Sequence, residues 1–464
     1  MRTRALLLLP LAAYLAFPTR NFYWDGVRFA IEIEKNTPLS ALAQPNHLIY
    51  ELCCAWLYDA FDWIGYPVRA LYLMQAANCV LAGLAVMLLY QCLRVYGWAE
   101  DQALMAAGIF GFSATWWKFA SDADAYIPAI FLLLCAYWLL AKPGLVWLAA
   151  LAHAGAMLFH QLAIFFLIVA VTVLWKRRTI LATYCLLSLA PVAAAYVWAY
   201  QVQNPPATFL AWLTSHSADS SFDFNPLKDL GYTLRGTVRL FFGGRWPDLV
   251  PNAGSVIVCV LLAGAVIGFA ITAWRAWPFE RVHPARAVLL WIAVYVAFLF
   301  FWMPQNTFYR LFYLAPLIAL LAPRSSHAGW LVVAVLMLWN FAFLVYPESR
   351  PAFNAPLRFA LAQHDAWPAG SPIVFHRYHP DLWTISYFNQ QASWIGLGSA
   401  DLGQMEHDLD YAHRQAKPLW VEETAYELLD GTPAGRQWLR SHERRDELVR
   451  FADAKHEFVF HSMR

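Results

Sequence analysis

Long apolar stretches separated by short polar segments fill the first three quarters of the chain. A helix that crosses the roughly 30 Å hydrocarbon core of a bilayer needs about 20 mostly apolar residues. The pattern therefore predicts a mainly α polytopic membrane protein with about 11 transmembrane helices. The predicted spans are 5–17, 68–90, 103–119, 126–140, two spans within 144–175, 179–199, 254–274, 287–303, 309–322 and 329–346.

The first apolar segment, 5–17, follows Arg2 and Arg4 and has the form of either a cleaved signal peptide or a membrane helix. We interpret it as a retained helix, because no clean small-residue cleavage site follows it. Lys and Arg gather on the cytoplasmic side of membrane proteins. The two arginines therefore place the N-terminus in the cytoplasm and residue 25 on the outer side.

The apolar stretch 144–175 is too long for one span, since a single helix of this length would extend about 46 Å. A tight outer turn at His160 and Gln161 divides it into two short spans. The turn also places Lys142 and the basic run 176–178 on the same cytoplasmic side, as the positive-inside rule requires. We therefore predict a helical hairpin here.

Residues 47–62 are apolar but include three carboxylates, which are costly in lipid. Their helical spacing gathers Glu51, Asp59 and Asp62 on one side. We interpret this segment as an amphipathic helix on the outer surface and not as a span.

Residues 347–464 have the charge content of a soluble protein, and the predicted topology makes this domain extracytoplasmic. Short β-branched and aromatic runs predict strands in "SPIVFHRYHP", "PLWVEE" and "HEFVFHS". Helical segments are expected near 401–416 and 424–448. The sequence thus predicts a transmembrane domain, 1–346, followed by a small C-terminal extracytoplasmic α/β domain, 347–464.

Composition supports the membrane assignment, because the chain is 60% hydrophobic and only 14% charged, whereas a soluble domain is about a quarter charged. The net charge of +2 argues against a nucleic-acid partner. All seven cysteines lie before residue 260, without the spacing of a metal site. The C-terminal domain therefore has no disulfide, and Cys53 and Cys54 are interpreted as packing residues.

Several polar residues from distant parts of the chain fall at the outer membrane face in this topology. Such convergence is expected of a site at a membrane–water boundary. These residues are Asp25, His47, Asp122, Asp124, His160 and Arg310.

The order of these motifs resembles that of the GT-C fold membrane glycosyltransferases, the superfamily of protein O-mannosyltransferases and lipid A aminoarabinose transferases. An acidic residue follows the first span in "NFYWDGVRFA", and "QPNHLIYELCCAWLY" and an arginine-led span, "VRALYLMQAAN", come next. The acidic-aromatic "WWKFASDADAYIPAIFLLLCAYWLL" opens the fourth span, and "HQLAIFFL" and "YRLFYLAPLIALLAP" follow later. Where family members often read "HPPLYY", this chain has "PNHLIY".

The resemblance implies catalytic roles for three carboxylates. Asp25 matches the family's first acidic residue, which acts as a base or orients the acceptor, and its alternative is an interfacial turn or cap residue. Asp122 and Asp124 match the second acidic motif, with Asp124 preferred because it is nearer the apolar run. Their alternative role is helix N-capping before Tyr126. No cofactor is certain, and a divalent metal held by Asp25 and Asp124 is kept as an alternative.

The remaining candidates would bind substrate. His47 would contact the acceptor or the donor phosphate, Tyr126 would offer an aromatic surface, and His160 is either a ligand or a buried structural residue. Arg28 would pair with Asp25 or bind phosphate. Arg310 would hold the donor phosphate through its planar guanidinium, the alternative being snorkelling to head groups.

Arg235 and Arg239, four residues apart on one helical face, would bind phosphate or lipid head groups. His153 lies on an apolar face and is interpreted as structural.

These features together predict an inverting glycosyltransferase in the cell inner (cytoplasmic) membrane, multi-pass, with its active site facing outward. Its partners would be a polyprenyl-phosphate-sugar donor, membrane lipid, and a glycan, lipid or protein acceptor. A multi-pass transporter is the alternative, although transporters usually have internal repeats and charges near the bilayer midplane. A non-catalytic membrane scaffold is the third reading.

Overall fold

The computed structural model describes residues 3–215, 224–244, 285–321, 326–398, 419–441, 444–452 and 456–463, with scattered helical positions between 257 and 271. Contacts divide the chain into two compact units. The helical unit contains Met1–Thr19 and Glu32–Pro347, and the sheet unit contains Arg20–Ile31 and Glu348–Arg464. The segment Arg20–Ile31 therefore belongs to the sheet unit, although it follows the first apolar segment in sequence. The extracytoplasmic placement of residues 347–464 stays a prediction.

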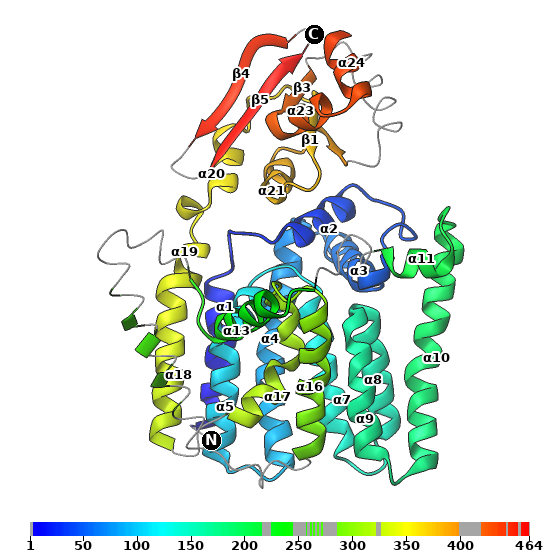
Figure 1. Cartoon of the computed structure of the whole chain (residues 1–464), viewed down its shortest axis with the longest axis vertical. Helices are drawn as coiled ribbons and strands as arrows, with labels where there is room; N and C mark the ends of the chain where they lie inside the picture. Colours follow the sequence, from blue (N-terminus) through cyan, green and yellow to red (C-terminus); the bar gives the residue numbers. More distant parts are fainter. Residues whose placement is uncertain are drawn as a thin grey trace. The chain divides into compact units, whose positions relative to one another are not determined.

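Most of the helical unit consists of upright helices joined by short loops (Figure 1). The larger helices are α1 (Leu8–Ala16), α3 (Tyr50–Trp63), α4 (Ala70–Val95), α5 (Glu100–Phe112), α6 (Ala114–Ala120), α7 (Tyr126–Leu140), α8 (Val146–Phe159), α9 (Phe166–Leu174), α10 (Arg178–Gln203), α11 (Phe209–Leu213), α13 (Pro226–Phe241), α16 (Ala285–Phe301), α17 (Leu311–Leu321) and α18 (Ser326–Asn340). Short turns of helix are η1 (Thr3–Leu7), η2 (Pro45–His47), η3 (Gln161–Phe165), η5 (Phe308–Arg310) and η6 (Phe341–Val345).

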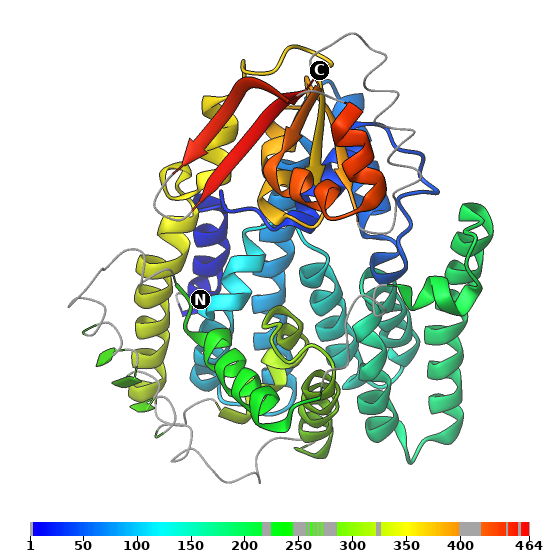
Figure 2. The same ribbon diagram turned by 45° about the horizontal axis from the view of Figure 1, so that its top comes forward.

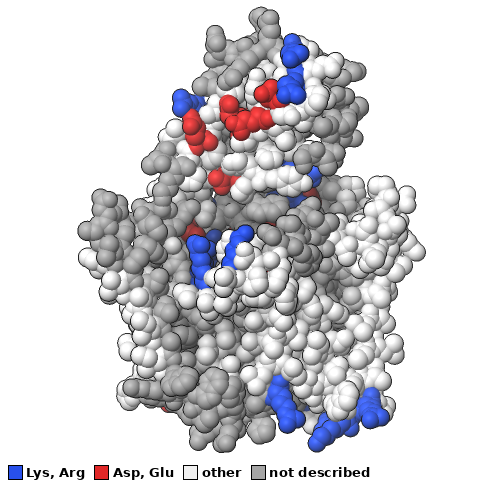
Figure 3. Space-filling model, viewed as in Figure 1, with Lys and Arg blue, Asp and Glu red and all other residues white. Residues whose placement is uncertain are grey.

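Three helices among the described residues are long and apolar enough to cross a bilayer: Ala70–Val95, Arg178–Gln203 and His327–Glu348. Six shorter apolar helices accompany them. On the face drawn in Figure 3, the middle of the helical unit is almost free of charged side chains, and Lys and Arg gather at its lower end. The count of about 11 spans stays a prediction, and the predicted span 254–274 falls largely outside the described residues.

The predicted break in 144–175 is confirmed, because α8 ends at Phe159 and η3 begins at Gln161. His160 between them has an extended backbone, with φ −157° and ψ 126°. His153, predicted to be structural, is fully buried, with Nε2 2.9 Å from the Ala163 carbonyl and Nδ1 3.0 Å from the Tyr184 hydroxyl.

The predicted helix 47–62 forms as η2 and α3, so its three carboxylates share one side of α3, but the helix does not lie on the surface along its whole length. Glu51 is fully buried, whereas Asp59 and Asp62 are exposed. The first turn of α3 lies in the packed interior of the unit, while its last turn leaves Trp63 exposed. Tertiary packing therefore buries one end of a helix face whose other end is exposed.

The sheet unit contains five strands in the order β2-β1-β3-β5-β4. The strands are β1 (Pro372–His376), β2 (Ser393–Leu397), β3 (Leu419–Glu422), β4 (Arg444–Ala452) and β5 (Glu457–Met463), with helices α20 (Ala355–Ala362), α21 (Pro380–Phe388), α23 (Glu423–Asp430) and α24 (Pro433–Ser441). β1 pairs in parallel with β2 and β3. β5 pairs antiparallel with β3 and β4, and β4 and β5 form a long ribbon (Figure 2).

Alternation along β1 builds a core on each face of this sheet. Ile373 and Phe375 pack on one face with residues of α20 and α21. Val374 packs on the other face with residues of α23 and α24. The predicted α/β domain therefore has helices on both sides of a mixed sheet.

The three predicted strands are confirmed as β1, β3 and β5. The predicted helix 424–448 is right for α23 and α24 but wrong at its end, where β4 begins at Arg444. The charged residues of β4 carry little strand signal of their own, and pairing with β5 decides their conformation. The expected helix near 401–416 lies outside the described residues.

Candidate active site

The acidic loop before α7 is buried inside the helical unit. Asp122 is 0% exposed and Asp124 is 1% exposed. Asn78 of α4 holds the loop, because its Nδ2 donates to the carbonyls of Asp122 at 2.9 Å and Asp124 at 2.8 Å. Ala125 is the N-cap residue of α7, so neither aspartate is. The choice between a catalytic role and helix capping for these two carboxylates stays a prediction.

A second polar residue of α4 supports the same loop. The Nε2 of Gln75 donates to the carbonyls of Thr19 at 3.0 Å and Ser121 at 3.1 Å. Gln75 and Asn78 are three residues apart, so one face of α4 presents both amides to the chain.

The first turn of α3 lies near the acidic loop. Burial raises the pKa of the Tyr50 hydroxyl well above its ordinary value, and the negative charges of Asp124 and Asp122 raise it further. The phenol is therefore neutral at ordinary pH and can donate a proton in a hydrogen bond. Together with the buried Glu51, Tyr50 makes this end of α3 part of the polar interior.

Six rings from four parts of the chain form the aromatic cluster: His47, Tyr126, His160, Phe308, Tyr309 and Phe312. The ring centroids of His47 and His160 are 4.8 Å apart, and that of Tyr126 is 5.0 Å from His160. Phe308 lies 5.3 Å from Tyr126, and Phe312 lies 4.9 Å from His160. The structure thus brings together the three predicted binding residues His47, Tyr126 and His160.

The hydrogen bonds of the two imidazoles define different roles for them. His47 Nδ1 lies 3.2 Å from the Phe159 carbonyl and must donate to it, which leaves Nε2 as an acceptor in the neutral ring. His160 Nδ1 accepts from the Leu162 amide at 3.1 Å, so the neutral ring carries its proton on Nε2. In the neutral rings, Nε2 of His47 can therefore accept a hydrogen bond, and Nε2 of His160 can donate one.

Arg310 is 1% exposed, and its guanidinium donates to three backbone carbonyls. Nη1 donates to Asn306 at 3.0 Å, and Nη2 donates to Pro304 at 2.7 Å and Tyr232 at 3.3 Å. Arg310 is the last residue of η5 and lies two residues before Phe312. Its hydrogen bonds therefore hold in place the loop that carries Phe308 and Tyr309. Binding of the donor phosphate by Arg310 stays a prediction.

Arg235 and Arg239 lie on the exposed side of α13, where Arg239 is tied to α6 through its carbonyl, which accepts from Thr115 Oγ1 at 2.9 Å. Partial burial lowers the pKa of Arg239, and the like charge of Arg235 lowers it further. The two guanidinium groups are thus near enough to repel each other. Binding of phosphate or lipid head groups by these two arginines stays a prediction.

Asp25 and Arg28 belong to the sheet unit, in the first turns of α2 (Trp24–Glu34). The Arg20 amide donates to the Glu348 carbonyl at 2.6 Å, and the rings of Phe22 and Phe388 are 5.9 Å apart. These contacts attach the segment to its unit. The convergence of Asp25 with the residues of the helical unit stays a prediction.

The pKa of the Asp25 carboxyl group lies above its ordinary value. Burial raises its pKa to about 6, although the Arg28 guanidinium lowers it. Arg28 itself lies over the Trp24 ring at 5.8 Å and the Phe29 ring at 5.2 Å. A carboxyl with this pKa can take up and release a proton near neutral pH, as a general base must.

Across the part of the chain that the structure describes, no three His, Cys, Asp or Glu side chains gather as they would around a metal ion. The alternative of a metal held by Asp25 and Asp124 stays a hypothesis.

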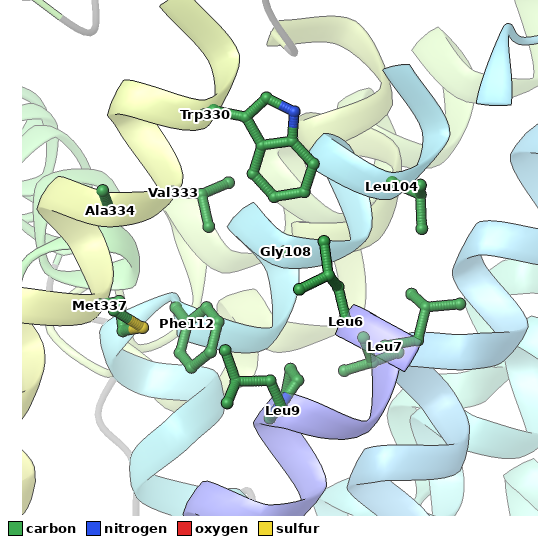
Figure 4. Close-up of a pocket in the computed structure, with 12 residues that line it drawn as sticks. Leu6, Leu7, Leu9, Leu104, Gly108, Phe112, Trp330, Val333, Ala334 and Met337 are labelled. Atoms are coloured by element: carbon green, nitrogen blue, oxygen red, sulfur yellow. The ribbon is translucent and has the colours of Figure 1, made fainter. Parts of the chain in front are cut away.

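An apolar pocket of about 200 Å³ lies elsewhere in the helical unit, between α1, α5 and α18 (Figure 4). Leu6, Leu104 and Trp330 are among its lining residues, and none of the lining side chains is titratable. This pocket therefore offers no acid or base.

Sequence reasoning missed Gln75, Asn78, Tyr50 and the ring of Phe308. The amides of Gln75 and Asn78 carried a signal, because they are polar residues on one face of an otherwise apolar span. Phe308 carried none, since one more aromatic residue is unremarkable in a chain that is 17% aromatic.

Neither a protein-family model nor a curated protein matches the chain. Solved structures do. The crystal structure of ArnT from Cupriavidus metallidurans bound to undecaprenyl phosphate has a TM-score of 0.60 at 11% identity, covering 98% of this chain and 97% of that one. The archaeal oligosaccharyltransferase AglB from Archaeoglobus fulgidus, in complex with an inhibitory peptide and a dolichol-phosphate, has a TM-score of 0.51 at 10% identity, covering 98% of this chain and 74% of that one. The chain therefore has the fold of the GT-C membrane glycosyltransferases.

Proposed function

We propose that the protein is an inverting glycosyltransferase, which moves a sugar from a polyprenyl-phosphate donor to an acceptor at the outer face of the cytoplasmic membrane. The observation that carries this proposal is the likeness to ArnT, which extends over nearly the full length of both chains. That structure contains undecaprenyl phosphate, and the AglB structure contains a dolichol-phosphate. A lipid phosphate is thus the ligand common to the two neighbours.

The reaction needs an acceptor hydroxyl to attack the anomeric carbon from the face opposite the phosphate. The new glycosidic C–O bond forms as the C–O bond to phosphate breaks, and the polyprenyl phosphate leaves with the electron pair. The acceptor's proton passes to a carboxylate, and the sugar gains oxocarbenium character in the transition state. Buried, fixed charges stabilise such a state better than water does.

The described side chains suit these tasks. Asp25, with a pKa of about 6, is the proposed base that takes the acceptor's proton. Asp124, supported by Asn78, is the proposed carboxylate beside the sugar. The aromatic cluster would pack against the sugar face or the first prenyl units, and His47 and His160 would bind hydroxyl or phosphate oxygens.

The test uses the full-length protein in lipid nanodiscs with a panel of labelled polyprenyl-phosphate sugars and with lipid, glycan and protein acceptors. Transfer of the label from the donor to an acceptor fraction is the expected result. Uptake of free sugar by vesicles that contain the protein, without any transfer, would instead favour the transporter alternative. Asp124→Ala should abolish most transfer while leaving the detergent-extracted protein monodisperse.

A further inference from the structure

Helix α13 has three distinct faces along its length. Residues seven and eleven apart share one face of an α-helix, since each residue turns the helix by about 100°. The N-terminus of the helix is capped, because the Asn225 side chain accepts from the Lys228 amide at 3.2 Å and Pro226 is the first helical residue. It lies across the upright helices in both ribbon views (Figures 1 and 2).

The first face packs against the helical unit. Asp229, Gly236 and Leu240 are buried and follow the seven-and-eleven spacing. A Cβ at Gly236 would lie only 2.5 Å from Arg310 Nε, so the helix approaches the guanidinium as closely as a glycine allows. The buried face of α13 therefore contacts the residue that holds the loop of Phe308 and Tyr309.

The second face is apolar and exposed. Leu227 is 83% exposed, Leu230 47% and Leu234 61%. Their spacing of three and seven residues makes one continuous stripe. Exposed leucines in a row are unfavourable in water, at about 25 cal/mol per Å² of apolar surface, and favourable in the acyl region of a bilayer.

The third face is basic. Lys228, Arg235 and Arg239 repeat the seven-and-eleven spacing, and the centre of their stripe lies about 130° around the helix from that of the leucine stripe. Among the described residues no carboxylate forms an ion pair with Arg235 or Arg239. Figure 3 shows two cationic side chains next to each other where Figure 1 draws α13.

We propose that α13 is an in-plane membrane helix whose leucine stripe enters the acyl region and whose basic stripe, Lys228, Arg235 and Arg239, binds the phosphates of anionic phospholipids. A helix with an apolar stripe beside a basic one binds the bilayer boundary in this way. The expected ligand is bulk phospholipid and not the sugar donor, because three cations spread along the helix, with leucines beside them, match an extended lipid surface better than one phosphate.

The test uses the whole protein in nanodiscs of phosphatidylcholine, with or without phosphatidylglycerol, and needs neither donor nor acceptor. Its outcome is therefore independent of the proposed transferase activity. Leu234→Cys is treated with a water-soluble maleimide, and peptide mass spectrometry identifies the modified cysteine. Tyr378→Cys, at a side chain 60% exposed in the sheet unit, is the accessible reference.

Residue 234 should react at least tenfold more slowly than residue 378, and phosphatidylglycerol should strengthen the protection. In native mass spectra the triple variant Lys228→Gln/Arg235→Gln/Arg239→Gln should lose bound phosphatidylglycerol, by about fivefold in affinity for each charge. The double variant Arg235→Lys/Arg239→Lys, which keeps the charges, should retain it. Removal of three charges at Lys176, Arg177 and Arg178 is the matched control and should leave the protection of residue 234 unchanged.

Equal labelling of residues 234 and 378 would overturn the placement of the leucine stripe. Undiminished phosphatidylglycerol binding and protection in the triple variant would overturn the role of the basic stripe. A separate native mass spectrum with added polyprenyl phosphate tests the other ligand. Loss of this lipid in the triple variant, with phosphatidylglycerol binding intact, would also overturn the role of the basic stripe and would assign it to the donor.

Discussion

The two units bury ionisable side chains in different numbers and with different partners. Among its described residues the helical unit buries eight Asp, Glu, His and Arg side chains at 5% exposure or less: His47, Glu51, Asp122, Asp124, His153, His160, Asp229 and Arg310. The described part of the sheet unit buries three such side chains, Glu348, Glu422 and His461. Glu422 accepts from the Ala425 amide at 3.2 Å as the N-cap of α23, and His461 pairs with Glu423. A buried ionisable group costs free energy, whereas a cap stabilises its helix. The capped Glu422 and the paired His461 therefore serve folding, whereas the acidic loop of the helical unit and Asp25 of the sheet unit are the groups that we propose for chemistry.

Replacement of the proposed base should give the largest effect. Asp25→Asn keeps the shape but cannot take a proton, so transfer should fall by about 10²- to 10⁴-fold. In the wild type a pKa of about 6 means that the carboxyl is protonated below pH 6, so activity should fall as the pH decreases through that value. A pH–rate profile of both proteins measures this, and an unchanged profile in the Asn variant would make Asp25 structural.

A core substitution in the sheet unit should act on stability instead. Phe359 is fully buried and stacks on Phe458 and Phe460 at 5.4 and 5.8 Å. Phe359→Ala should destabilise this unit by about 3–5 kcal/mol. Urea unfolding followed by limited proteolysis measures the change. The matched control Leu361→Ala, at a side chain 57% exposed, should be nearly silent.

The carboxylates of the acidic loop separate function from stability within the helical unit. Asp124→Ala should lower transfer by about ten- to a hundredfold, the value of a lost charge-assisted interaction. Asp122→Ala should cost less. Steady-state kinetics at saturating donor compares the two. The reverse order would give the principal role to Asp122, whose Oδ1 already accepts from the Ala123 amide at 2.8 Å.

Arg310 should give the smallest effect on turnover. Arg310→Lys keeps the charge but cannot maintain the three carbonyl hydrogen bonds in the same geometry. The free energy of unfolding should therefore fall by roughly 1.5–3 kcal/mol. If the guanidinium also binds the donor phosphate, the apparent donor KM should rise by more than the thermal stability accounts for. Gly236→Ala serves as the comparison, since its Cβ would crowd the same guanidinium without changing the charge of Arg310. Equal donor kinetics in the two variants would leave Arg310 only a structural role.

The sequence by itself determined the elements whose signal is local. The apolar runs located α4, α7 and α10, and the positive-inside rule placed the turn at His160. Three of the five strands followed from their β-branched and aromatic runs. The order of motifs was enough to indicate the GT-C fold.

Only the tertiary structure decided which of these residues meet. Helical period grouped Glu51 with Asp59 and Asp62, yet packing buries the first and exposes the others. Arg20–Ile31 joined the sheet unit because of contacts with residues more than 300 positions away. β4 became a strand because β5 supplied its hydrogen bonds. A local pattern indicates the conformational preference of one segment. Burial, strand pairing and the contacts among His47, Tyr126 and His160 depend instead on partners that are distant in the chain.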